Sequence, residues 1–129
     1  MGNITASKED YLEVIYDLLQ KSTEIRSIDV ANALSFSRAS VSRAIGNLKQ
    51  DGFILQQPYG KITLTPSGLS AAKKVRTRHN LIKYYLVNTL CIPENIAEED
   101  ACKMEHIISV ETLTAIENAA IGHKENRDK

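Results

Sequence analysis

The sequence predicts a mainly helical fold, in which an N-terminal winged helix-turn-helix with a small β-hairpin wing is followed by a C-terminal helical dimerisation domain. Two observations predict it. Three helical segments, with a tight turn between the second and the third, precede two short strand-like segments, an order typical of winged helices. A long helical segment then leads into two more with aliphatic residues at helical spacing. We expect one domain over residues 1–65 and a long linking helix with a second domain over residues 66–129.

The first helix is predicted from Ser7 to about Lys21. Ser7 is a residue type that caps helices, and the acidic residues after it favour a first turn. The apolar residues recur at helical spacing: Tyr11, Leu12, Val14, Ile15, Leu18 and Leu19. This helix is therefore expected to bury one face.

A helix-turn-helix is predicted next. Its parts are a second helix over residues 27–34, a turn over residues 35–37 and a third helix over residues 38–50. Ser37 is suited to cap the third helix, and Gly52 to end it, because glycine tolerates the left-handed conformation of a helix stop. Three apolar residues of the third helix are spaced to be buried: Val41, Ile45 and Leu48.

The wing and the C-terminal helices follow. Strands are predicted over residues 53–57 and 61–64, with a turn between them. Thr65 as cap and Pro66 as first residue start a long helix that runs to about Leu90. A fifth helix is expected from Pro93 to about Ser109 and a sixth from Val110 to about Gly122. The polar tail from His123 is expected to fray.

Composition points to a cytoplasmic protein that does not enter membranes. No apolar run approaches the ~20 residues of a membrane span, and the N-terminus lacks the features of a signal peptide. Two cysteines, Cys91 and Cys102, do not make a disulfide framework. The formal net charge is zero, yet residues 1–90 carry 12 Lys/Arg against 7 Asp/Glu, and residues 91–129 carry 4 against 9. A basic first part suits DNA binding, although chance segregation on solvated faces gives the same pattern.

The third helix is the predicted DNA reader, since the second helix of a helix-turn-helix enters the major groove by its N-terminal residues. The candidate contacts on this helix and on the wing are Ser37, Arg38, Ala39, Ser40, Ser42, Arg43, Tyr59 and Lys61. Arginines pair with phosphates or guanine edges, serines bond either, and an alanine suits a thymine methyl group. The alternative is a helical bundle with a hairpin that binds protein.

Possible metal ligands stand near both ends of the chain. They are Asp10, Glu13, His79, Cys102, Glu105 and His106. Residues three or four apart share a helix face, and thiolate, carboxylate and imidazole together suit a divalent metal such as Fe²⁺, Zn²⁺, Co²⁺ or Mn²⁺. Each residue has a simpler interpretation. Asp10 can complete a capping box with Ser7, Cys102 can be a small buried residue, and the others can lie on solvated faces.

The arrangement resembles the iron- and manganese-dependent repressors typified by the diphtheria toxin repressor and the manganese transport regulator. The resemblance covers nearly the whole chain and rests on Glu9–Tyr16, Ser40–Ser42, Leu64–Gly68, Arg78–Leu81 and Asp100–Ser109. It implies a homodimer formed through the C-terminal helices. It also implies a metal site between the first, long and fifth helices with the six ligands above, and metal-dependent binding of double-stranded operator DNA.

The chain is a hybrid of the two types that it resembles. Manganese-type members are similar at Asp10 and Glu13 but carry Glu where this chain has Cys102, whereas iron-type members are similar at Cys102 but carry Met at the position of Asp10. Iron-type members also have an acidic residue and a His where this chain has Lys83 and Glu98, and a cationic Lys83 argues against their ancillary site.

The sequence thus predicts a non-enzymatic, dimeric repressor of metal-homeostasis genes, activated by Mn²⁺ or Fe²⁺, with Zn²⁺ or Co²⁺ acting in vitro. Residues 66–129 would bind the metal and dimerise, and the operator would be pseudo-palindromic. The apolar residues expected at the dimer interface are Ile96, Met104, Ile107, Ile108, Val110, Leu113 and Ile116. The alternatives are a metal-independent winged-helix regulator, a redox sensor that uses Cys102, and a metallohydrolase, for which no His-Glu-x-x-His motif is present.

Overall fold

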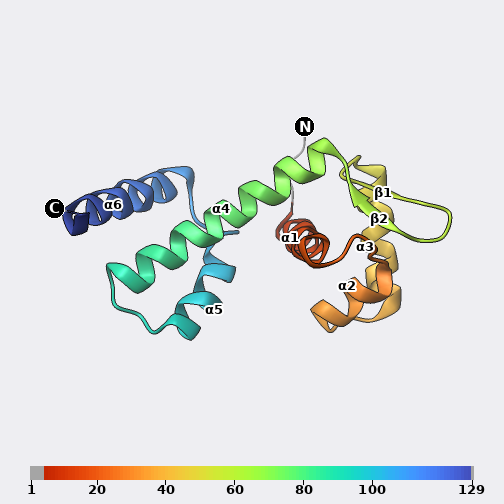
Figure 1. The fold of residues 1–129 in the computed structure, drawn as a ribbon, viewed down its shortest axis with the longest axis horizontal. Helices are drawn as coiled ribbons and strands as arrows, with labels where there is room; N and C mark the ends of the chain where they lie inside the picture. The colour runs from red at the N-terminus through yellow and green to blue at the C-terminus, as the bar shows by residue number, and fades with distance from the viewer. Residues whose placement is uncertain (1–4, 129) are drawn as a thin grey trace. The chain divides into compact units, whose positions relative to one another are not determined.

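The computed structural model describes the backbone of residues 5–128 and the side chains of residues 5–121. The chain divides into two compact units, residues 1–74 and 75–129. The elements in chain order are α1 (Ala6–Lys21), α2 (Ser27–Leu34), α3 (Arg38–Gln50), β1 (Ile54–Gln56), β2 (Ile62–Leu64), α4 (Pro66–Asn88), α5 (Glu94–Met104) and α6 (Val110–Asp128) (Figure 1). The mainly helical fold with a β-hairpin is as predicted.

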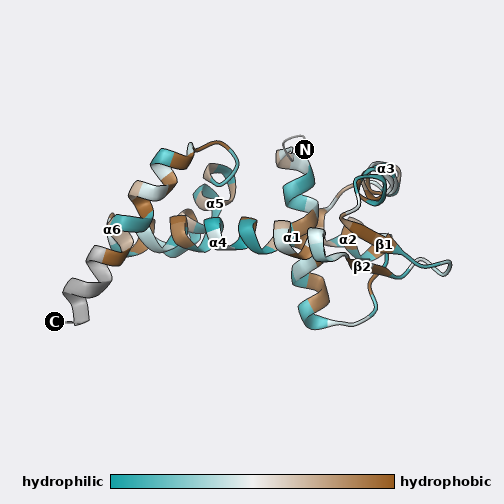
Figure 2. Ribbon diagram, turned by 90° about the horizontal axis from the view of Figure 1, so that it is seen from above, coloured by the Kyte–Doolittle hydropathy of each residue, from teal (hydrophilic) through white to brown (hydrophobic). Residues whose placement is uncertain are grey.

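The first unit is a winged helix. Helix α1 contacts α2, α3 and β2, while α3 contacts α2 and β1. The largest fully buried side chains of this core are Leu12, Ile15, Val30, Val41, Ile45, Leu48, Ile54 and Ile62. Parts of the two strands and of α1 are brown in Figure 2, the colour of hydrophobic residues. The three residues of α3 predicted to face inward are therefore confirmed as core.

The turn between α2 and α3 has the geometry that the sequence predicts. Ser35 ends α2 in the left-handed region, at φ 58°. Ser37 caps α3, where its hydroxyl oxygen accepts a hydrogen bond from the Ser40 amide at 3.2 Å. Satisfying this free amide fixes the point at which α3 begins.

The wing is a short antiparallel hairpin whose turn is tied back to the helices. Ile54 pairs with Leu64 in the register. The Arg26 side chain donates from Nε to the carbonyl oxygen of Tyr59 at 3.1 Å, and the Ile62 amide donates to the carbonyl oxygen of Ile25 at 2.8 Å. Both contacts join the hairpin to the segment that precedes α2.

The start of α4 lies very close to the segment that leads into β1. Thr65 caps the helix as predicted, because its Oγ1 accepts from the Gly68 amide at 3.0 Å while its hydroxyl donates to the carbonyl oxygen of Gly52 at 2.6 Å. A Cβ atom on Gly68 would stand 1.9 Å from the carbonyl oxygen of Phe53. Only a residue without a side chain permits this approach.

Helix α4 carries a buried stripe with alternating spacings of three and four residues. Its members are Ala72, Val75, His79, Ile82 and Leu86. In the second unit, the last two pack with Ala97 and Ala101 of α5 and Ile116 of α6. The one polar residue in the stripe, His79, therefore lies inside an otherwise apolar seam.

Several predicted boundaries were wrong. Thr5 rather than Ser7 caps α1, accepting from the Lys8 amide at 3.2 Å, so the capping box that joined Ser7 to Asp10 is also wrong. Helix α5 ends at Met104 instead of Ser109, because residues 105–107 form a turn, and α6 continues to Asp128, through the segment predicted to fray. Among the described residues, no helix is long and apolar enough to cross a membrane.

Candidate metal centre and DNA-reading surface

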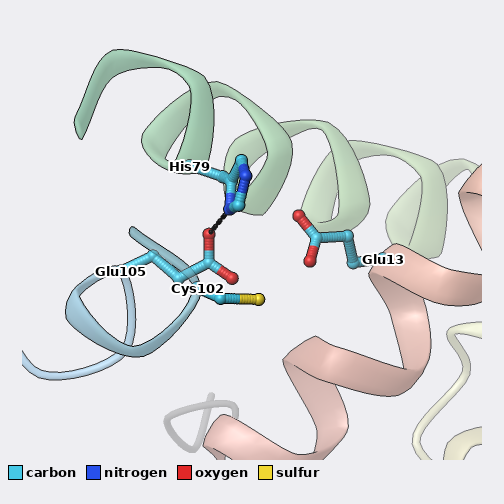
Figure 3. Close-up of side chains that lie close together, drawn as sticks. All are labelled: Glu13, His79, Cys102 and Glu105. Atoms are coloured by element: carbon cyan, nitrogen blue, oxygen red, sulfur yellow. Dashed lines mark hydrogen bonds and ion pairs between the residues drawn. The ribbon is translucent and has the colours of Figure 1, made fainter. Parts of the chain in front are cut away.

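His79 is the centre of a polar cluster in the second unit. Its side chain is 2% exposed, and an imidazole in an apolar seam needs polar partners to offset the loss of water. Its Nδ1 lies 3.1 Å from Oε2 of Glu105 in a hydrogen bond (Figure 3). Its Nε2 is buried and has no hydrogen-bond partner among the described side chains. One ring nitrogen is therefore hydrogen-bonded and the other is not.

Glu105 is a buried carboxylate between two imidazoles. It follows the last residue of α5 and is 2% exposed. Its Oε2 contacts His79, and its Oε1 lies 3.4 Å from Nε2 of His106. A carboxylate and two imidazoles at this separation are a typical donor set for a divalent transition metal.

Cys102 stands one turn before Glu105 in α5, and its side chain is exposed. His79, Cys102 and Glu105 each offer one ligand atom, and these atoms lie within 4.8 Å of one another. Figure 3 shows the thiol beside the Glu105 carboxylate. The second unit thus gathers four of the six predicted ligands, since His106 adjoins Glu105.

A second carboxylate lies on the other side of His79. Oε1 of Glu98 is 3.0 Å from Nε2 of His79, at ion-pair distance but outside hydrogen-bonding geometry. Oε2 of Glu98 pairs with Nζ of Lys83, also at 3.0 Å. Burial raises the pKa of Glu98, but the contacts with Lys83 and His79 outweigh it and hold the pKa below its usual value. The hydrogen bond to Glu98 in turn raises the pKa of Lys83.

The other two predicted ligands belong to the first unit. Asp10 and Glu13 are three residues apart in α1 and therefore share a helix face. Asp10 is half-buried, whereas Glu13 is 7% exposed. A buried carboxylate is costly unless a cation or a donor compensates it, so Glu13 has the property expected of a ligand.

The donor set of the second unit fits a divalent metal ion. Glu105 offers a buried carboxylate, and His79 a buried imidazole with one nitrogen that lacks a hydrogen bond. The thiol of Cys102 and the imidazole of His106 are adjacent. These hard and softer donor atoms are ones that Mn²⁺, Fe²⁺, Co²⁺ and Zn²⁺ accept. The simpler interpretation, in which these residues lie on solvated faces, does not apply to His79 and Glu105 because both are buried.

The predicted DNA-reading residues form an exposed surface on the first unit. The exposed members are Ser37, Arg38, Ala39, Ser40, Ser42, Arg43 and Tyr59, and Lys61 is half-buried. Five of them lie in the first turns of α3 and Ser37 is its N-cap, while Val41 and Ile45 of the same helix are buried. The start of α3 therefore presents arginine and serine side chains to solvent on the first unit.

Glu98 is a contact of the centre that the candidate ligand set left out. Glu98, Cys102 and Glu105 follow the spacing i, i+4, i+7, so they share one face of α5. Extending the ligand pattern back by one turn would have found this residue. The helical spacing of His79 from the apolar Val75 and Ile82 was a second usable signal.

A winged helix followed by a helical unit with this donor set defines a class: DNA-binding regulators that carry a metal-binding domain. Residues 3–62 match the family described as the iron-dependent repressor N-terminal DNA-binding domain. Residues 65–125 match the iron-dependent repressor metal-binding and dimerisation domain.

Individual relatives are transcriptional regulators of the same kind. An uncharacterised helix-turn-helix-type transcriptional regulator of Methanocaldococcus jannaschii is 37% identical over 111 residues, 85% of this chain and 89% of the relative. The transcriptional regulator MntR of Salmonella typhimurium is 37% identical over 107 residues, 83% of this chain and 68% of the relative. A solved manganese-dependent transcriptional repressor in complex with manganese has a TM-score of 0.80 at 27% identity. The comparison covers 88% of this chain and 52% of that one, so this chain spans about half the length of the solved protein.

The chain therefore belongs to the iron-dependent repressor family. That family consists of transcriptional regulators.

Proposed function

We propose that this protein is a repressor that binds a divalent metal ion, Mn²⁺ or Fe²⁺, and then binds operator DNA as a homodimer. The observation that carries the proposal is the buried Glu105 carboxylate between His79 and His106. Burial of these groups in the second unit is a cost that a bound cation offsets. The exposed arginines and serines at the start of α3 support the DNA-binding part of the proposal.

The metal ligands in this proposal come from both units. His79, Cys102, Glu105 and His106 hold the ion in the second unit, while Asp10 and Glu13 supply two carboxylates from α1. A bound ion would supply positive charge that neutralises these carboxylates. Residues 1–65 would then serve as the DNA-binding domain and residues 66–129 as the metal-binding and dimerisation domain.

The mechanism is linkage between two binding events. Metal binding favours one arrangement of α1 relative to the second unit, and operator DNA favours the same arrangement. Such coupling is typically about 1–3 kcal/mol, roughly 5–150-fold in affinity, and it is reciprocal. DNA must therefore tighten metal binding by the same factor by which metal tightens DNA binding.

The dimer in this proposal uses exposed apolar residues of the second unit. Of the seven residues predicted for the interface, Ile116 belongs to the unit's own core, and Met104, Ile108 and Leu113 pack against that core. The exposed members are Ile96, Ile107 and Val110. A symmetric dimer would place two α3 helices on the two halves of a pseudo-palindromic operator. Since the relatives are bacterial and archaeal regulators, the protein would act in the cytoplasm.

The decisive test is DNA binding measured against each of Mn²⁺, anaerobic Fe²⁺, Zn²⁺ and Co²⁺, with metal-free protein as the reference. We expect about 5–150-fold tighter operator binding with at least one of them. Equal affinity with and without every metal would favour a metal-independent regulator. A response to peroxide that the Cys102→Ser variant loses, while its response to metal persists, would favour a redox role for the exposed thiol.

The first prediction concerns Arg38 and Arg43 on the exposed start of α3. Replacing a base-reading arginine with alanine should cost about 1–3 kcal/mol at one operator position, whereas replacing a phosphate contact should weaken all sequences alike. Binding to an operator and to its single-base variants separates the two outcomes. Lys21→Ala, an exposed change at the end of α1, is the control. Wild-type affinity in both arginine variants would show that α3 is not the reader.

The second prediction concerns metal choice. A thiolate shifts preference away from Mn²⁺ and towards Fe²⁺, Co²⁺ and Zn²⁺, whereas the oxygen of Asp10 acts in the opposite sense. Cys102→Glu is therefore expected to raise the response to Mn²⁺ relative to Fe²⁺ and Co²⁺ in a DNA-binding titration. Cys91→Ser, at the other exposed cysteine, is the control. An unchanged order of metals would show that the Cys102 thiol does not bind the ion.

A further inference from the structure

Arg26 is the residue that precedes α2, and the start of that helix fixes its backbone. Its amide donates to Oδ2 of Asp29 at 2.8 Å, and its carbonyl oxygen accepts from the Asp29 amide at 3.0 Å and from the Val30 amide at 3.3 Å. Helix α2 in turn contacts α3. The backbone of Arg26 therefore has a defined place relative to the helix that carries the candidate DNA-reading residues.

The side chain of Arg26 runs to the turn of the wing, residues 57–61. Its Nε donates to the carbonyl oxygen of Tyr59, 33 positions further along the chain, at 3.1 Å. A Cβ atom on Gly60 would stand 3.9 Å from Cγ and Cδ of Arg26, so the aliphatic part of the side chain lies beside the turn. A hydrogen bond from a charged donor is stronger than one between neutral groups. Arg26 thus meets the turn both through a polar bond and through its aliphatic stem.

The other hydrogen bonds of the turn are internal to the hairpin. The Gly60 amide donates to the carbonyl oxygen of Gln57 at 2.8 Å, and the Gln57 amide donates to that of Lys61 at 2.9 Å. Nε2 of Gln56 donates to the carbonyl oxygen of Gly60 at 3.3 Å. These bonds shape the turn but do not fix it relative to the helices. Among the residues that the structure describes, the hydrogen bond from Arg26 is the one that joins the turn to the helical part of the unit.

The turn carries the two wing residues that are candidate DNA contacts. Tyr59 is 88% exposed, so its side chain gains little from packing, and Lys61 is half-buried. The place of Tyr59 is then set by its backbone, whose carbonyl group Arg26 holds. A contact group that is ordered before binding loses less conformational freedom on binding than a mobile one. Holding the turn therefore favours operator binding.

We propose, resting on the DNA-binding function above, that Arg26 is a positioning residue for the wing. Its Nε–H holds the turn in the place from which Tyr59 and Lys61 contact operator DNA. Arg26 strengthens operator binding through these two residues and not through a phosphate contact of its own. The effect depends on a donor at the position of Nε and not on the charge of the guanidinium group.

Two neutral replacements of Arg26 separate the donor from the charge. Glutamine carries its amide nitrogen on Cδ, as arginine carries Nε, whereas methionine has a methyl group at the same position along the side chain. Each full-length chain is titrated against a duplex that wild type selects from a random-sequence pool, with the ion among Mn²⁺, Fe²⁺, Co²⁺ and Zn²⁺ that stimulates binding most. Arg26→Gln is expected to bind like wild type, and Arg26→Met roughly 2–12-fold more weakly, the factor that corresponds to one net hydrogen bond. Arg26 is exposed, so both variants are expected to fold, which circular dichroism checks.

A double-mutant cycle tests whether Arg26 acts through the wing. In a chain that carries Tyr59→Ala and Lys61→Ala, the further change Arg26→Met is expected to alter DNA affinity by less than about twofold, because the side chains that Arg26 positions are gone. Tyr59→Ala keeps the carbonyl group that accepts from Arg26. Arg43→Ala, in α3, is the matched background. There Arg26→Met is expected to weaken binding by its full factor, since independent effects add.

The outcomes separate this proposal from the one on which it rests. Equal losses in Arg26→Gln and Arg26→Met, with a salt dependence of binding that falls by about one phosphate contact, would show direct DNA contact and overturn the positioning role. Wild-type affinity in Arg26→Met, or a full loss in the chain that lacks both wing side chains, would overturn it as well. None of these results touches metal-dependent repression. A wild-type chain that selects no duplex with any of the four ions would overturn the proposed function, and the role of Arg26 with it.

Discussion

The Glu105→Gln variant is expected to lose metal-stimulated DNA binding while keeping its fold. Glutamine has nearly the same volume as glutamate, so the buried position at the end of α5 stays filled. The change removes the negative charge between His79 and His106. Since replacing even a supporting residue around a metal typically costs about 10–100-fold in metal affinity, loss of a ligand should cost at least about 100-fold.

Thermal unfolding measures the same loss without DNA. A ligand at 100 times its dissociation constant stabilises a protein by about 2.7 kcal/mol, so wild type should melt at a clearly higher temperature with metal. Glu105→Gln should melt at the same temperature with and without it. Glu99→Gln, at an exposed position of α5, is the matched control. A metal-induced shift of wild-type size in Glu105→Gln would contradict the assignment of this ligand.

A second large effect is expected from Gly68→Ala at the start of α4. The added Cβ would stand 1.9 Å from the carbonyl oxygen of Phe53 and 2.8 Å from its carbon, so backbone has to move. That movement would disturb the Thr65 cap, which bonds both Gly68 and Gly52. Forced overpacking typically costs about 1–3 kcal/mol and occasionally more, and we expect the upper end here. The melting temperature should fall by roughly 10 °C or more, because each kcal/mol corresponds to about 4–8 °C in a domain of 60–100 residues.

Gly46→Ala is the matched control for this substitution. Gly46 lies in α3, and a Cβ atom there would meet nothing within 4 Å. Alanine in the interior of a helix is more favourable than glycine by about 0.5–1 kcal/mol. The same change should therefore stabilise at one glycine and destabilise at the other. A Gly68→Ala protein that melts within a degree or two of wild type would show that the junction adjusts without cost.

Local chemistry made most of the fold predictable from the sequence. Ser37 and Thr65 are caps that act within three residues, and the spacing of Val41, Ile45 and Leu48 follows from the helical repeat. The errors concern helix ends where several residue types compete. Thr5 and Ser7 are both good caps, and the sequence does not say which one the chain uses. The end of α5 was missed because residues 105–108 combine polar and apolar side chains without a glycine or proline to mark the stop.

The metal centre was predictable as a set of residue types but not as a set of contacts. Spacing showed that Cys102, Glu105 and His106 lie close together, because residues three or four apart are neighbours on a helix. The contacts of His79 with Glu105 and Glu98 join residues 26 and 19 positions apart, and only tertiary packing brings them together. The ion pair of Lys83 with Glu98 depends in the same way on how α4 packs against α5.

The wing turn sets a limit on how the length of this chain can vary. Exposed hairpin tips usually accept inserted residues, and Tyr59 at this tip is 88% exposed. Here, however, the carbonyl oxygen of Tyr59 is held by Arg26, the Gly60 amide donates to Gln57, and the Gln57 amide donates to Lys61. These three bonds depend on the number of residues between the strands. An insertion at the tip would break at least one of them, so the wing should vary in side chains far more readily than in length.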